Sequence, residues 1–147
     1  MLKTKLLHPE ILAALARSGH GSKVLISDGN YPHWTTRSAN AEVVYLNLAP
    51  GKLTVTEVLD VLLTVLPVEA AAIMDTQKTG PYAMTQDPPI WDEFRQSLRD
   101  ASLNLELTRI ERHAFYEAVK DPSVCLVIAT GEQRIYANLL LTIGVVK

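Results

Sequence analysis

Residues 18–32 read Ser-Gly-His-Gly-Ser-Lys-Val-Leu-Ile-Ser-Asp-Gly-Asn-Tyr-Pro and join the end of a helix, a short strand and a polar turn. The run 23–27 is apolar and rich in branched side chains, which is typical of a strand buried on both faces. Such strands belong to α/β sheets, where ligands bind beyond the carboxyl ends of the strands. Asp28 follows this strand, so the sequence places it where a ligand would bind.

His20 stands before the same strand, between Gly19 and Gly21. The glycines leave the imidazole unhindered, and an accessible imidazole suits proton transfer near neutral pH. A histidine beside glycines is also a common feature of a helix end, and Asp-Gly-Asn-Tyr-Pro is an ordinary turn sequence. These residues alone leave both interpretations open.

Composition limits the classes of protein to which the chain can belong. A chain of 147 residues with 48% hydrophobic content can bury one ordinary core, which predicts a single domain over residues 1–147. The net charge of −2 and the absence of basic runs argue against a nucleic-acid partner. Cys125 is the only cysteine, and no stretch approaches the roughly 18 apolar residues of a membrane span. We expect a cytoplasmic protein with no membrane partner.

Hydrophobic patterns along the chain predict strands that alternate with helices. Helices are expected from Pro9 to Gly19, after the capping box Thr54-Val-Thr-Glu57, after Asp87 and, briefly, over 114–117. Further strands are expected at 42–46, 70–74, 103–107, 124–129 and 139–146. This alternation predicts a three-layer α/β domain, with a mixed, largely parallel sheet covered by helices on both faces.

Two loops and one possible metal site are the features whose roles the sequence does not decide. Trp34, with His33 and Arg37 in the loop 29–40, is either a packing anchor or a wall on which a sugar stacks. The polar loop 76–87 carries no assignment. His20, Asp28 and His33 match no known metal-ligand spacing, so we expect no metal site.

Several short motifs, taken in order, identify a family. They are Gly19-His-Gly21, Ser27-Asp28 with Pro32, the run 111–117 (Glu-Arg-His-Ala-Phe-Tyr-Glu), Thr130-Gly-Glu132, and Tyr136-Ala-Asn-Leu-Leu-Leu141 followed by Gly144-Val145. On these motifs, over nearly its whole length, the chain resembles the fucose mutarotase/ribose pyranase (RbsD/FucU) family of sugar-anomer enzymes.

The resemblance implies an RbsD-like fold and a set of site residues. It implies that His20 is the proton donor and that the sugar is bound by Asp28, Arg112, Tyr136 and Asn138. His113, Tyr116 and Glu132 lie in the matching motifs and are possible further site residues. The resemblance also implies a ring-shaped homo-oligomer, a pentamer or a decamer, with sites shared between subunits, and no cofactor.

The motifs also bear on the sugar. The segments 110–112 and 115–117, with Pro89-Ile-Trp91, resemble the fucose branch, so we expect an L-fucose mutarotase. His113 and the Tyr136-Ala-Asn138 sequence resemble the ribose branch, which keeps a D-ribose pyranase as an alternative. A non-catalytic sugar-binding accessory of a transport system is a second alternative, because it would need Asp28, Arg112 and Asn138 but no titrating His20.

The expected chemistry needs only acid and base groups. A general acid protonates the ring oxygen while a base removes the anomeric hydroxyl proton, and the open-chain aldehyde then closes on its other face. An imidazole can give and retake this proton.

Overall fold

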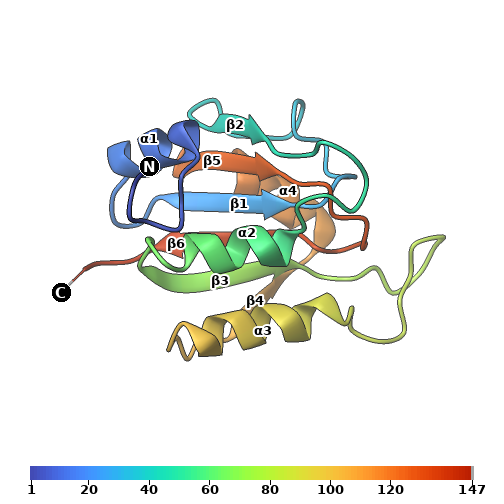
Figure 1. Ribbon diagram of the computed structural model, residues 1–147. Coiled ribbons are helices and arrows are strands. Elements are labelled where there is room, and N and C mark those ends of the chain that lie inside the picture. The colour runs from blue at the N-terminus through green and yellow to red at the C-terminus, as the bar shows by residue number, and fades with distance from the viewer. Residues whose placement is uncertain (147) are drawn as a thin grey trace.

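The computed structural model describes residues 1–146 and shows one sheet with helices on both faces (Figure 1). Within this range it contains four helices and six strands, in the order α1 (Pro9–Arg17), β1 (Lys23–Ser27), β2 (Glu42–Tyr45), α2 (Val55–Leu62), β3 (Val68–Met74), α3 (Ile90–Asp100), β4 (Leu107–Ile110), α4 (Arg112–Lys120), β5 (Val124–Ala129) and β6 (Leu139–Ile143). The strand order across the sheet is β2-β5-β1-β6-β3-β4.

The sheet is mixed and largely parallel, as the sequence predicts. Strand β5 pairs in parallel with β1 and β2, and β3 pairs in parallel with β4. Strand β6 runs antiparallel between β1 and β3, with Leu139 opposite both Ile26 and Ile73. The start of β6 therefore lies at the edge of the sheet where β1 and β3 end.

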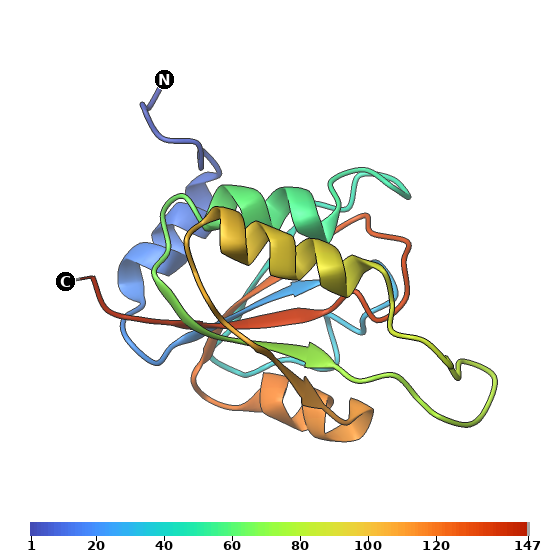
Figure 2. The same ribbon diagram turned by 90° about the horizontal axis from the view of Figure 1, so that it is seen from below.

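The three layers are also confirmed. Helices α1, α2 and α3 cover one face of the sheet, and α4 covers the other (Figure 2). Val24, Leu25 and Ile26 have no exposed surface, so β1 is buried on both faces, as its unbroken apolar run predicts. The aromatic rings of Trp91 and Phe94 on α3 and of Phe115 on α4 are fully buried. In residues 1–146 no helix is both long and apolar enough to cross a membrane.

Two helix starts follow from capping chemistry. The hydroxyl of Thr54 accepts a hydrogen bond from the backbone N–H of Glu57, whose side chain accepts one from the N–H of Thr54, so the predicted capping box is confirmed. The carboxylate of Glu111 accepts hydrogen bonds from the N–H groups of His113 and Ala114. This cap fixes the start of α4 and so the direction of its first residue, Arg112.

Several predicted boundaries are wrong, and three of them differ by three residues or more. The strand expected at 103–107 begins only at Leu107, because β4 has a partner only where it lies opposite Ala71–Met74 of β3. The last strand ends at Ile143 instead of residue 146, since the N–H of Gly144 leaves the ladder and donates to the carbonyl of Pro67. The short helix expected at 114–117 extends from Arg112 to Lys120.

Candidate active site

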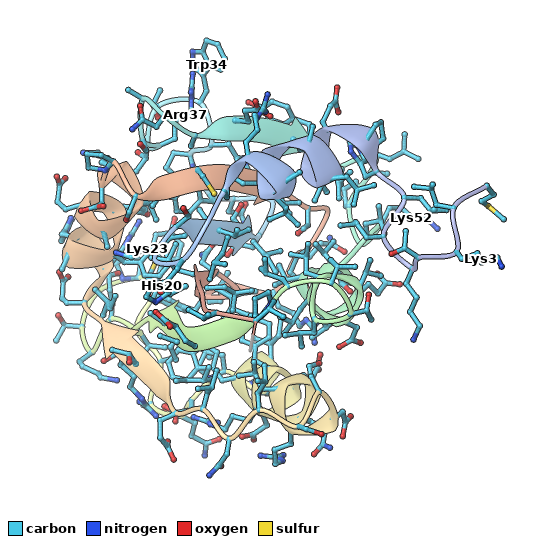
Figure 3. The ribbon with its side chains drawn as sticks, turned by 90° about the vertical axis from the view of Figure 1, so that its left-hand side faces the viewer. Lys3, His20, Lys23, Trp34, Arg37 and Lys52 are labelled. Atoms are coloured by element: carbon cyan, nitrogen blue, oxygen red, sulfur yellow. The ribbon has the colours of Figure 1, made fainter. Side chains whose placement is uncertain are left out.

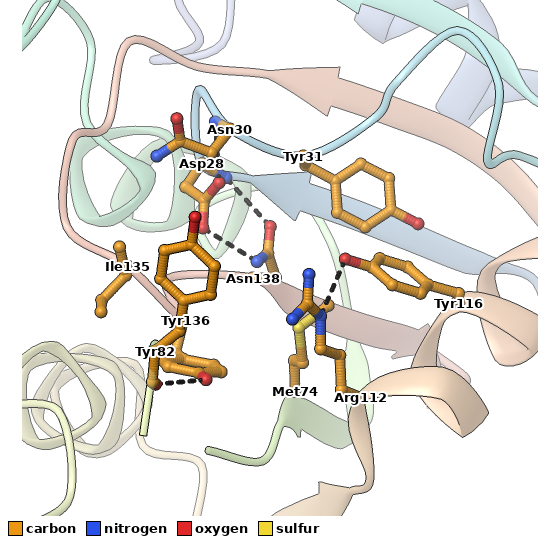
Figure 4. A pocket seen from close by; sticks show the side chains of 10 residues that line it. All are labelled: Asp28, Asn30, Tyr31, Met74, Tyr82, Arg112, Tyr116, Ile135, Tyr136 and Asn138. Carbon is orange, nitrogen blue, oxygen red and sulfur yellow. Dashed lines mark hydrogen bonds between the residues drawn. The ribbon is translucent and has the colours of Figure 1, made fainter. Parts of the chain in front are cut away.

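A cleft of about 340 Å³ opens at the edge of the sheet where β1 and β3 end and β6 begins. Its volume is near the lower end of the roughly 300 to 1,000 Å³ of small-molecule sites, which suits a small ligand. Figure 4 shows the side chains that line it, namely Asp28, Asn30, Tyr31, Met74, Tyr82, Arg112, Tyr116, Ile135, Tyr136 and Asn138. The structure thus brings together Asp28, Arg112, Tyr136 and Asn138, which the sequence singled out, and adds Tyr116 from the possible set.

Asp28 and Asn138 form a fixed polar pair on one side of the cleft. The side-chain Nδ2 of Asn138 donates to Oδ2 of Asp28 at 2.9 Å, and the backbone N–H of Asp28 donates to Oδ1 of Asn138 at 3.1 Å. The other carboxylate oxygen accepts from the N–H of Asn30 at 2.9 Å. Each of the two paired residues is only 3% exposed.

Burial raises the pKa of Asp28 above its ordinary value, although hydrogen bonds from Asn30 and Asn138 act in the opposite direction. A carboxylate removed from bulk water accepts hydrogen bonds strongly, because few water molecules compete for its lone pairs. The pair is therefore suited to accept hydrogen bonds from the hydroxyl groups of a ligand.

Arg112 and Tyr116 face this pair from the first turns of α4. The Nε of Arg112 donates to the hydroxyl of Tyr116 at 3.3 Å, which raises the pKa of the guanidinium and keeps it charged. Figure 4 shows the guanidinium pointing into the cleft, between Asn138 and Tyr116. The ring of Tyr31 lies against Tyr116 with centroids 5.8 Å apart, so two aromatic side chains extend this wall.

Tyr136 holds an unusual backbone conformation at the cleft. Its φ of 60° is in the left-handed region, which a residue with a Cβ adopts only when surrounding contacts hold it there. The indole Nε1 of the buried Trp91 donates to the backbone carbonyl of Tyr136 at 3.1 Å. The hydroxyl of Tyr136 donates to the backbone carbonyl of Tyr82 at 2.8 Å and accepts from the backbone N–H of Gln77 at 3.1 Å.

These two bonds tie the loop 76–87 to the cleft, with Tyr82 in its lining. The sequence carries no signal for this attachment. Asn30, Tyr31, Met74 and Ile135 were also missed as lining residues, although the first two lie in the turn after β1 that the sequence analysis singled out.

His20 lies away from the cleft, at the opposite edge of the sheet. It precedes β1, whereas Asp28 follows it, and the five residues of the strand span roughly 16 Å. Figure 3 looks onto this edge and labels His20 near the start of β1. The imidazole Nε2 lies 3.0 Å from a carboxylate oxygen of Glu69. One chain therefore does not bring its own His20 to its own Asp28, and the catalytic role of His20 stays a prediction.

The other candidates lie outside the lining set. His113 packs edge-on against Tyr116, with centroids 6.4 Å apart. Glu132 is buried, but Arg134 donates to both of its carboxylate oxygens. The charge of Glu132 is therefore neutralised by an ion pair within the chain. Trp34 is 73% exposed and lies beside the guanidinium of Arg37, so within one chain it is neither a packing anchor nor a wall of the cleft.

The possible metal ligands do not converge either. His33 is buried with its Nε2 2.8 Å from the hydroxyl of Ser27, while His20 lies at the far edge. In the part of the chain that the structure describes, no three His, Cys, Asp or Glu side chains are grouped to hold a metal ion.

Comparison with known proteins places this geometry in context. Residues 1–146 match the RbsD / FucU transport protein family. The chain is 34% identical to the fucose mutarotase of Homo sapiens over 145 residues, which cover 95% of this chain and 90% of that protein. The fucose mutarotase of Mus musculus is 32% identical with the same coverage.

Two solved structures share the fold over the full length of both chains. The fucose mutarotase from Streptococcus pneumoniae, in complex with L-fucose, superposes with a TM-score of 0.83 at 25% identity. Bacillus subtilis RbsD, complexed with D-ribose, superposes with a TM-score of 0.76 at 25% identity.

The tether between Tyr136 and the loop 76–87 can be tested by hydrogen exchange. Tyr136→Phe removes the hydroxyl that accepts from the N–H of Gln77, so this amide should exchange about tenfold faster or more, in line with a lost hydrogen bond of about 1.4 kcal/mol. Tyr45→Phe is the matched control, because Tyr45 is an exposed tyrosine outside the cleft. Equal exchange of Gln77 in all three proteins would show that the hydroxyl does not hold the loop.

Proposed function

Because the chain belongs to the RbsD / FucU transport protein family, we propose that it is a monosaccharide mutarotase, an isomerase that interconverts ring forms of L-fucose or a related sugar. The observation that carries this proposal is the cleft itself, where the buried Asp28–Asn138 pair faces the guanidinium of Arg112 across a space of monosaccharide size. Similarity to curated fucose mutarotases over 95% of the chain supports it.

The lining suits a sugar with polar and apolar faces. The carboxylate of Asp28 accepts hydrogen bonds from hydroxyl groups, and the guanidinium of Arg112 donates to two neighbouring oxygens at once, which a lysine cannot do. Met74 and Ile135 add apolar surface, which suits the C6 methyl group of fucose. These residues bind and orient the sugar, and ring opening then needs one acid and one base.

In the proposed reaction the protons balance without a cofactor. A general acid donates a proton to the ring oxygen as a base takes the proton of the anomeric hydroxyl, and the bond between the ring oxygen and C1 breaks to give an aldehyde. The aldehyde group then rotates about the bond between C1 and C2. The former ring oxygen attacks the other face of C1, and both protons return. We assign the acid role to His20.

This assignment requires a second copy of the chain. His20 belongs to the edge of the sheet opposite the cleft, and its side chain is 60% exposed, so it is free to enter the cleft of a neighbour. We therefore include in the proposal a ring-shaped homo-oligomer, a pentamer or decamer, with sites shared between subunits. Exposed apolar side chains such as Leu48 and Trp34 are suited to subunit contacts. A cytoplasmic location, in keeping with the free thiol of Cys125, completes the proposal.

Two other functions remain as alternatives. A D-ribose pyranase is favoured by His113, by the Tyr136-Ala-Asn138 sequence and by the structural likeness to RbsD complexed with D-ribose. A non-catalytic sugar-binding accessory would use the same cleft without proton transfer. Both alternatives keep the binding roles of Asp28, Arg112 and Asn138.

Saturation-transfer NMR on L-fucose, D-ribose and other aldoses tests the three functions together. We expect magnetisation to pass between the anomers of L-fucose faster than in buffer, because the protein would catalyse ring opening. Faster exchange for D-ribose than for L-fucose would instead identify a pyranase. Exchange at the uncatalysed rate for every sugar, with binding retained, would show an accessory protein.

The role of Arg112 can be measured as sugar affinity. Arg112→Ala should weaken binding by about 1 to 3 kcal/mol, or roughly five- to 150-fold, through loss of a charged hydrogen bond. Arg95→Ala is the control, because Arg95 pairs with Asp92 on α3, outside the cleft. Calorimetric titration that gives the same affinity for both variants would restrict Arg112 to its contact with Tyr116.

Shared sites predict complementation between two inactive variants. His20→Asn should slow exchange by about a hundredfold or more, because an amide cannot transfer a proton, and Asp28→Asn should weaken sugar binding. In mixed rings, one site in four would combine an intact His20 with an intact Asp28 of the neighbour, which predicts about a quarter of wild-type activity. Co-expressed variants that stay as inactive as each alone would rule out sites shared in this way.

A further inference from the structure

A second cleft, of about 420 Å³, opens at the same edge of the sheet as the cleft that holds Asp28. Strands β1, β5 and β2 lie parallel to one another, so their carboxyl ends meet at this edge. The loops that follow these strands supply the lining, with residues 29–30 after β1, 47–50 after β2 and 130–133 after β5. Ligands of α/β sheets bind beyond the carboxyl ends of strands, so this position suits a binding site.

Close backbone contacts fix the three loops relative to one another. The N–H of Gly29 donates to the carbonyl of Glu132 at 2.9 Å. The N–H of Gly51 donates to the carbonyl of Gly131 at 2.6 Å. A Cβ at Gly131 would collide with the carbonyl oxygen of Lys52, so only glycine allows this close approach of the two loops. The second cleft is therefore formed before any ligand binds, which lowers the entropic cost of binding.

The lining of the second cleft is polar but carries almost no free charge. Asn30, Asn47 and Gln133 present side-chain amides and are exposed at the cleft. Glu132 is the one ionisable side chain among the lining residues, and hydrogen bonds from Arg134 at 2.9 and 2.8 Å neutralise it. An amide both donates and accepts, so it pairs with neighbouring hydroxyl groups, whereas an anion or a cation would find no counter-charge here. This chemistry fits a neutral ligand rich in hydroxyl groups, such as a sugar.

The two clefts meet at Asn30, which lines both of them. The N–H of Asn30 donates to Oδ1 of Asp28 at 2.9 Å, so Asn30 stands directly beside the carboxylate that is proposed to hold sugar hydroxyls. Figure 4 shows the side chain of Asn30 next to Asp28, at one side of the first cleft. The first cleft, of about 340 Å³, and the second, of about 420 Å³, each suit one sugar ring. The clefts are therefore neighbours, as are the two rings of a disaccharide.

We propose that the second cleft binds a further sugar unit, so that the substrates of this protein include reducing disaccharides. This inference rests on the proposed function. The unit that opens lies in the first cleft with its anomeric hydroxyl free, because ring opening removes the proton of that hydroxyl. The second unit is attached through a different hydroxyl, the one that faces Asp28 and Asn30. The protons balance as they do for a monosaccharide, and the bond between the two units stays intact.

Disaccharides of known linkage test the proposal by saturation-transfer NMR. The probes are L-fucose with a galactosyl unit on O2, O3 or O4, and free L-fucose is the reference. We expect at least one of the three to undergo catalysed anomeric exchange with a KM about two- to tenfold below that of L-fucose, since each neutral hydrogen bond in the second cleft adds about that factor. Exchange of L-fucose alone, or a KM that is lower for none of the disaccharides, would overturn the inference.

Variants of the second cleft separate its role from that of the first. Gln133→Ala and Asn47→Ala remove exposed amides that do not line the first cleft, so each should raise the KM of the preferred disaccharide about two- to tenfold. The kcat and KM for L-fucose should stay as in wild type. Gln96→Ala is the matched control, because Gln96 is an exposed glutamine on α3 outside both linings. A disaccharide KM that neither cleft variant changes would overturn the inference.

Side-chain amide signals give a readout that needs no catalysis. The ¹⁵N–¹H signals of Asn47 and Gln133 should shift during titration with at least one of the three disaccharides and stay unchanged with L-fucose. Shifts caused by L-fucose alone would reveal an independent site and overturn the extended substrate. Absence of exchange with every aldose in the wild type would contradict the proposed function, whereas catalysed exchange of L-fucose without a response of these signals to any disaccharide would contradict this inference alone.

Discussion

The antiparallel course of β6 between β1 and β3 is the constraint on which the site depends. In a wholly parallel sheet the start of this strand would lie at the edge far from Asp28. Reversal of the strand brings Asn138, the residue before β6, to the end of β1, where two hydrogen bonds join it to Asp28. The same reversal places Tyr136 beside the loop that follows β3.

The chemistry of the cleft carries a cost in stability. Burial of a carboxylate is unfavourable unless donors compensate it, and Asp28 receives donors from Asn30 and Asn138 while its pKa still lies above the ordinary value. Because the folded-state pKa is raised, the contribution of this group to stability is greatest at acid pH and is lost as pH rises through that pKa. The left-handed backbone of Tyr136 is a second local cost. Both occur at the cleft, where the proposed reaction takes place.

The two edges of the sheet carry different parts of the proposed reaction. Binding groups gather at the carboxyl ends of β1 and β3, whereas His20 and Glu69 stand at the amino ends of the same strands. A rigid sheet keeps these edges apart, so no side-chain movement within one chain can join them. Association of chains is therefore part of the catalytic proposal, and an isolated chain would have the binding cleft without its acid.

The sequence by itself determined the features that depend on neighbouring residues. The apolar run 23–27 marks a buried strand, and the Thr54–Glu57 pair marks a helix start. The resemblance of short motifs to a known family further implied that Asp28, Arg112, Tyr136 and Asn138 share one site. Only the tertiary structure decided that Tyr82 lines the cleft, that β4 begins at Leu107, and that Glu69 lies beside His20. The physical reason is that local patterns record burial and turns, whereas contacts between distant segments depend on the order and direction of strands. The direction of β6 is such a property, because an apolar strand has the same pattern whichever way it runs.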